Sequence, residues 1–91
     1  MTEFIVELYV SRNGAGAVAE SASRARQAAE QMTREGATVR FLRTMFVPED
    51  ETCFYLYEAE SEEAVREAAG RAALPVERVA KAMTELESER R

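Results

Sequence analysis

Six side chains that could do chemistry fall on predicted strands of this sequence. A carboxylate shielded among aromatic rings can act as an acid or base, and a tyrosine hydroxyl can donate to a developing oxyanion. Tyrosine and arginine on apolar walls can instead orient a small organic ligand. The candidate ligand-binding residues are Glu7, Tyr9, Arg40, Cys53, Tyr55 and Tyr57. Two of them, Glu7 and Tyr55, are also the candidate catalytic groups.

Other chemistries find weaker support. The chain contains no histidine and one cysteine, and no histidine stands near Cys53 to activate it. The acidic run at 49–51 lacks the alternating oxygen ligands of a calcium loop, and the glycines at 14 and 16 lack the remainder of a phosphate-binding motif. We therefore predict no metal site and no cofactor.

The composition limits the classes of partner that the protein can have and the compartment in which it is expected. A net charge of −5, with basic residues scattered among acids, disfavours nucleic acid. No apolar run approaches the roughly 20 residues that span a bilayer, so no membrane association is expected. A lone cysteine cannot form an internal disulfide, which favours a reducing, cytoplasmic location. The 91 residues suffice for one core, so we predict a single domain at 1–86 and a charged tail at 87–91.

The first half of the chain predicts a strand and a long helix. Apolar residues alternate over residues 3–10, as in a half-buried strand. From residue 15 they recur every three or four positions, as in an amphipathic helix, which should end at Gly36. The apolar stripe is mostly alanine, so it buries little area per residue. Charged residues between the alanines, including Arg24, Arg26 and Arg34, are expected to form a solvated face.

The second half predicts a hairpin, a helix and a final strand. Two β-rich runs, 38–47 and 52–58, flank a polar turn with a proline. Ser61 suits the N-cap of a second helix, which should end before Pro75. Residues 76–86 fit a strand or a helix by local pattern, but a fourth strand would complete two βαβ halves. The expected fold is α+β, a ferredoxin-like βαββαβ with a four-stranded antiparallel sheet and two helices on one face.

The hairpin register decides which side chains share a face. With an even turn, Cys53, Tyr55 and Tyr57 lie on the face opposite Phe54 and Leu56. The same register puts Arg40, Leu42, Thr44 and Phe46 beside the tyrosines. We expect the other face to lie under the helices, with Phe4, Val6, Leu8, Val39, Phe41, Phe54 and Leu56. Ile5, Glu7 and Tyr9 would then join the tyrosines on the uncovered face. An odd register would replace Arg40 with Arg43.

Several stretches resemble a bacterial family labelled domain of unknown function 4242. The similar stretches are residues 46–51, 54–59, 61–68 and 74–79, with 4–7 at the start. The resemblance implies a ferredoxin-like fold, a final strand, a homodimer and an actinobacterial origin. Small nickel-binding proteins lie within or near that family, and their sites use histidines. Because this chain has none, no metal ligand carries over to it.

The uncovered face suggests three functions. It is too apolar to be left in water, so a second copy of the chain could cover it, with tyrosines as anchors and Glu7 paired to Arg40. Two sheets could also enclose a cleft for a small organic molecule. Our hypothesis is a small dimeric ligand-binding or accessory domain with such a cleft. The alternatives are a cofactor-free enzyme of isomerase, cyclase or monooxygenase type, and nickel binding, which the missing histidines disfavour.

Overall fold

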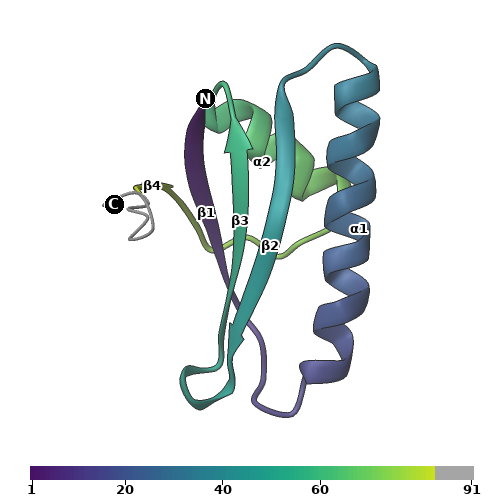
Figure 1. The fold of residues 1–91 in the computed structure, drawn as a ribbon. Helices are drawn as coiled ribbons and strands as arrows, with labels where there is room; N and C mark the ends of the chain where they lie inside the picture. Colours follow the sequence, from purple (N-terminus) through teal and green to yellow (C-terminus); the bar gives the residue numbers. More distant parts are fainter. Residues whose placement is uncertain (84–91) are drawn as a thin grey trace, which may run out of the picture.

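The computed structural model describes residues 1–83 and has the predicted ferredoxin-like order. The elements are β1 (Thr2–Tyr9), α1 (Ala15–Arg34), β2 (Val39–Val47), a 3-10 turn (Pro48–Asp50), β3 (Thr52–Ala59), α2 (Glu62–Arg71) and β4 (Arg78–Ala82). The strands form one antiparallel sheet in the order β2-β3-β1-β4 (Figure 1). The predicted α+β fold is therefore confirmed.

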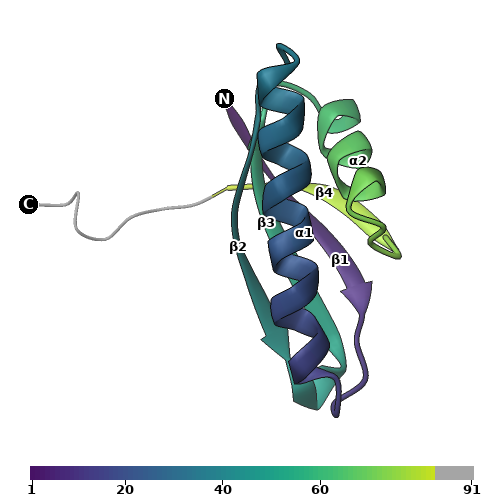
Figure 2. The ribbon, with the colours of Figure 1, turned by 90° about the vertical axis from the view of Figure 1, so that its right-hand side faces the viewer.

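Both helices pack on one face of the sheet and leave the other face open. Helix α1 contacts mainly β2, whereas α2 reaches β3, β4 and β1, and the two helices lie side by side (Figure 2). The core lies between helices and sheet. Among the described residues, no helix is long and apolar enough to cross a membrane.

Helix α1 matches its predicted bounds. It ends at Arg34, and Gly36 follows with φ of +105°, a conformation that glycine adopts without a side-chain penalty. Its buried residues are Ala25, Ala28, Ala29 and Met32. Met32 is thus the one large side chain among them, and it buries more apolar area than any one of the three alanines.

Helix α2 ends earlier than predicted, and β4 follows. The Ser61 hydroxyl accepts a hydrogen bond from the Ala64 amide at 3.2 Å, which confirms the predicted N-cap. The helix ends at Arg71 because Ala73 adopts a left-handed conformation, with φ of +59°, ahead of Pro75. Strand β4 lies within the segment predicted as a strand. Residues 84–86 of that segment, and the predicted tail at 87–91, lie outside the described residues.

The pairing of β1 with β3 corrects the predicted faces. Phe4 pairs with Tyr57, Val6 with Tyr55, and Leu8 with Cys53. Paired residues point to the same side of a sheet, so the two tyrosines and the cysteine lie under the helices. Phe54 and Leu56 occupy the open face instead, opposite Glu7 and Ile5. The prediction had these two sets of β3 residues reversed.

A bulge in β2 explains why Thr44 and Phe46, expected on the open face, lie under the helices. Near the turn the predicted hairpin register is right, since Phe46 pairs with Cys53 and Thr44 with Tyr55. The register then shifts between Phe41 and Arg43, so Leu42 is an extra residue on β2. Thr44 and Phe46 therefore lie under the helices with Phe41 and Val39. Arg40 and Arg43 both lie on the open face, which answers the choice between them.

Candidate functional site

The structure does not bring the six predicted site residues together. Cys53, Tyr55 and Tyr57 are each 0% exposed and form part of the core under the helices. Glu7 and Arg40 lie on the open face, and Tyr9 lies at the end of β1, 55% exposed. One pocket cannot contain all six, because the sheet itself separates the two groups.

The two buried tyrosines have hydroxyl groups without hydrogen-bond partners. Both hydroxyls are inaccessible to solvent and unpaired. Ser21, Thr44 and Cys53 are polar neighbours of the Tyr55 hydroxyl, but none of them bonds to it in a favourable geometry. Burial raises the pKa of Tyr57, and the nearby Tyr55 phenol raises it further; burial also raises the pKa of Tyr55. Such orphaned groups are rare in folded proteins and call for an explanation.

Cys53 is a buried core residue whose sulfur contacts a neighbouring hydroxyl group. Its sulfur lies 3.3 Å from the Thr44 hydroxyl, and that hydroxyl also donates to the Phe54 carbonyl at 2.9 Å. The thiol is out of reach of any reagent in solution, which argues against the predicted contact with a ligand on the open face.

The candidate catalytic pair, Glu7 and Tyr55, lies on opposite faces of the sheet. Arg78 donates to the Glu7 carboxylate at 3.2 Å, so the carboxylate is ion-paired rather than shielded among aromatic rings. Arg40 pairs with Glu58 at 3.4 Å rather than with Glu7, because β3 lies between β1 and β2. Neither geometry supports acid–base catalysis by Glu7 with Tyr55.

Tyr9 belongs to a polar latch at the hairpin turn. Its hydroxyl donates to the Glu51 carboxylate at 3.5 Å, and the Arg12 amide donates to the same carboxylate at 3.0 Å. The bond from the Arg12 amide is the largest cause of a lowered pKa for Glu51. The latch joins the β1–α1 loop to the hairpin, so a structural role accounts for Tyr9.

A groove between α1 and the edge strand β2 combines positive charge with an aromatic wall. We call it the α1–β2 groove; its volume is about 420 Å³. It is lined by Arg26, Ala29, Glu30, Thr33, Arg34, Val39, Arg40 and Phe41. Of the six predicted residues, only Arg40 lines it. The groove is the described feature that best suits a small ligand.

Three guanidinium groups surround the α1–β2 groove. The Arg26 guanidinium carbon lies 5.3 Å from the centre of the Phe41 ring, in a cation–π contact. Among the described residues, no carboxylate forms an ion pair with Arg26 or Arg34, and Glu30 is the one acid of the lining. Sequence reasoning placed both arginines on a solvated face. Their spacing beside the buried Ala25 and Ala29 is the signal that could have placed them at a groove rim.

Thr33 fixes the geometry of the α1–β2 groove. Its hydroxyl lies 3.0 Å from the Ala29 carbonyl and 2.9 Å from the Val39 carbonyl. The second contact holds the end of α1 over the start of β2. The backbone on both sides of the groove is therefore connected by a side-chain hydrogen bond.

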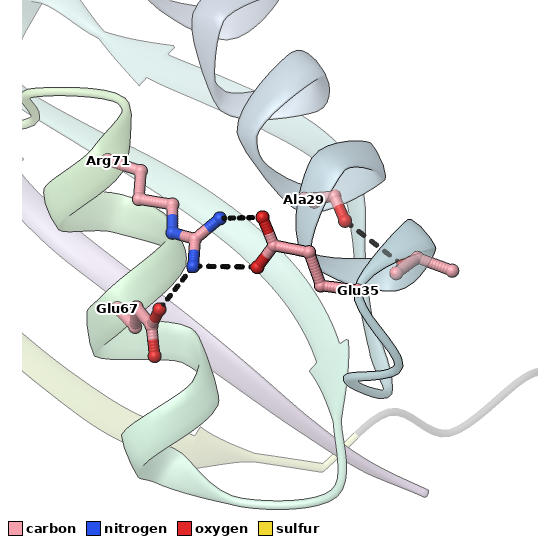
Figure 3. A network of polar contacts seen from close by, with 5 residues as sticks. Ala29, Glu35, Glu67 and Arg71 are labelled. Carbon is pink, nitrogen blue, oxygen red and sulfur yellow. Dashed lines mark hydrogen bonds and ion pairs between the residues drawn. The ribbon is translucent and has the colours of Figure 1, made fainter.

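Arg71 and two glutamates connect the C-terminal ends of the two helices. Arg71 makes two bonds to Glu35, at 2.9 and 3.1 Å, and one to Glu67 at 2.6 Å (Figure 3). The bonds from Arg71 lower the pKa of Glu35. Arg24, expected in solvent, donates to the Ala72 carbonyl at 3.0 Å. These charges position α2 against α1 and are already paired, so they offer little to a ligand.

The described residues contain no evident metal centre. Within residues 1–83 no three histidine, cysteine, aspartate or glutamate side chains lie close enough to hold a metal ion. A hollow at one end of the open face, lined by residues that include Glu3, Glu58 and Met83, contains none of the six predicted residues. The predicted cleft over the open face therefore has no counterpart within a single described chain.

Comparisons with known proteins identify the family. A search of curated proteins finds no match to this sequence. The crystal structure of SCO4226 from Streptomyces coelicolor A3(2) is similar with a TM-score of 0.72 at 20% identity, over 92% of this chain and 99% of that one. At that identity the likeness shows the fold alone. Residues 6–81 match the family described as nickel responsive protein SCO4226-like, which is consistent with the nickel-binding relatives that the sequence suggested and leaves the label 4242 unconfirmed. The chain thus belongs to the SCO4226-like family of nickel responsive proteins.

Proposed function

We propose that this protein is a small ligand-binding accessory domain that holds an organic anion in the α1–β2 groove. The observation that carries the proposal is the pair of guanidinium groups, Arg26 and Arg34, that line the groove without an ion-pair partner among the described residues, with Arg26 over the Phe41 ring. Guanidinium groups bind carboxylates through two parallel hydrogen bonds, and an apolar wall suits the body of an organic molecule.

The charge of the whole chain strengthens this interpretation. A protein with a net charge of −5 repels anions on average. A groove with three arginines and one glutamate in its lining is locally positive against that background. A neighbouring hollow also contains three arginines and one glutamate, but its Arg24 and Arg71 are already ion-paired, so an anion should favour the α1–β2 groove.

Calorimetric titration with cinnamate, a planar aromatic carboxylate, tests the proposal. We expect saturable binding that weakens about tenfold in Arg34→Gln, as loss of one charge-assisted hydrogen bond requires. Arg66→Gln is the matched control, because Arg66 pairs with Glu62 on α2, away from the groove. Equal affinity in both variants, or no binding by the native protein, would refute the proposal.

Nickel does not fit the described residues. The family name refers to nickel, but the chain has no histidine, Cys53 is inaccessible, and residues 1–83 contain no ligand cluster. Imidazole and thiolate are the usual protein ligands of such metals. No step of the proposed function therefore depends on a bound metal ion.

A homodimer is a second proposal, favoured by the open sheet face. The centre of that face is apolar, with Ile5, Met45, Phe54, Leu56 and Ala80. The ion pairs Arg40–Glu58 and Glu7–Arg78 place both charge signs around this centre. A face that is apolar in the middle and balanced in charge at its rim can meet its own copy without repulsion.

Sedimentation equilibrium tests the dimer directly. We expect a dimer mass for the native protein and a monomer mass for Phe54→Asp, because a charge at the centre of the contact would be buried without a partner. Glu63→Gln on the exposed side of α2 should leave the mass unchanged. A monomer mass for the native protein at all concentrations would contradict this proposal while leaving the α1–β2 groove untouched.

A further inference from the structure

We propose that the ligand of the α1–β2 groove is an aromatic acid with an uncharged hydroxyl at the end opposite its carboxylate, and that this hydroxyl bonds to the buried hydroxyl groups of Tyr57 and Tyr55. The inference rests on the proposed function and names its ligand class. It starts from the two tyrosine hydroxyls, which are buried and have no partner. Buried polar groups without partners are destabilising, so these two are poised to accept one.

Phe41 connects the groove to the tyrosines. It lines the α1–β2 groove, and its ring packs against Tyr57 with centroids 5.6 Å apart and against Tyr55 at 6.0 Å. Neither tyrosine lines the groove itself. A rotation of the half-buried Phe41 ring would therefore open the floor of the groove toward the two tyrosine rings.

The local backbone suits such a rotation. Phe41 lies on β2, an edge strand, next to the bulge at Leu42 where the regular pairing with β3 is interrupted. Its outer neighbour is the Arg26 guanidinium, an exposed side chain that can move with the ring. Only a side-chain change at the rim of the sheet is needed, and the core strands keep their register.

The chemistry of the site selects a neutral hydroxyl. A second charge at the inner end would be desolvated between apolar walls with no opposite charge to meet it. A hydroxyl can accept from one phenol and donate to the other, so it satisfies both orphaned groups at once. At the outer end Arg26 and Arg34 hold the carboxylate. The flat ring between them replaces Phe41 against the tyrosine rings.

Titrations of the native protein and of Tyr57→Phe with two probes test the inference. The probes are 4-hydroxycinnamate and cinnamate, which differ in the distal hydroxyl alone. We expect the native protein to bind 4-hydroxycinnamate about tenfold more tightly, because both buried phenol groups then gain a partner. Tyr57→Phe should reduce that preference to about threefold, because the Tyr55 hydroxyl remains, while its affinity for cinnamate stays unchanged.

Each other result contradicts the inference in a recognisable way. Equal binding of both probes by the native protein leaves the groove as an anion site and overturns the hydroxyl contact. A loss of affinity for both probes in Tyr57→Phe points to a structural effect and overturns it too. No binding of either probe overturns the proposed function together with this inference.

Discussion

Replacement of Met32 by alanine is expected to lower the free energy of unfolding by about 2–5 kcal/mol. Met32 is 3% exposed and is the one large residue among the four that α1 buries. The other three are alanines, so no neighbour on the helix can fill the cavity. The better helix propensity of alanine offsets little of this loss, since it amounts to a few tenths of a kcal/mol.

Chemical denaturation measures this effect, and the chain supplies a matched control. Met83 is 98% exposed, so Met83→Ala should change the free energy of unfolding by no more than about 0.5 kcal/mol. Small domains have about 5–15 kcal/mol in total, which makes the Met32 loss a large fraction of the whole. Similar values for the two variants would mean that α1 does not dock on the sheet as described.

Replacement of Tyr57 by phenylalanine is expected to raise the stability of the unliganded protein. The substitution removes a buried hydroxyl without a partner and keeps the ring. Removal of that desolvation penalty should raise the free energy of unfolding by about 1–3 kcal/mol. A tyrosine-to-phenylalanine change that loses a satisfied hydrogen bond has the opposite sign, so the direction alone is decisive.

The difference in free energy of unfolding between Tyr57→Phe and the native protein should increase at alkaline pH. The pKa of Tyr57 is raised in the folded protein by burial, so its stability contribution is complete below the unfolded pKa of about 10 and falls as pH rises above that value. Phenylalanine has no proton to lose. Unfolding followed by circular dichroism should thus begin at higher pH in Tyr57→Phe than in the native protein.

Tyr9→Phe is the control for this comparison. Its hydroxyl is exposed and makes one long bond to Glu51, so the free energy of unfolding should stay within about 0.5 kcal/mol of the native value. A lower stability for Tyr57→Phe would show that the hydroxyl has a partner in solution and would remove the basis of the proposed ligand contact.

The elements of the fold were predictable because each has a local signal. Alternation marked β1, three- and four-residue spacing marked α1, and Gly36 and Ser61 marked helix ends. The end of α2 was missed because the residue in the left-handed conformation after the helix is an alanine, Ala73. Glycine is the usual residue at that position and would have marked the helix end in the sequence. Strand β4 needed the topology of the whole sheet, since its own pattern is ambiguous.

The faces of the sheet were not predictable from local pattern. β3 is a central strand with apolar residues on both sides, so Phe54 and Leu56 fit the core as well as Tyr55 and Tyr57 do. Hydrophobicity therefore could not fix its orientation. The bulge at Leu42 has no sequence signal either, and it reverses the orientation along the second part of β2.

The α1–β2 groove was not predictable from the sequence. Sequence reasoning expected tyrosine hydroxyls, Glu7 and Arg40 in a cleft over the open face, and of that set Arg40 alone lines the groove. Local patterns did not identify Arg26, Arg34 and Phe41 as site residues. Each pattern describes one element, whereas the groove forms where a helix packs against an edge strand. Only the packing of α1 over β2 brings these side chains together.

The complete burial of Cys53 makes the native protein a convenient background for labelling. Thiol reagents need an accessible thiolate, and this sulfur is enclosed between sheet and helices. A cysteine introduced at an exposed position on α1 such as Gln27 could thus carry a fluorophore or spin label while the native thiol does not react. Motions of α1 over the groove become measurable without first removing the natural cysteine.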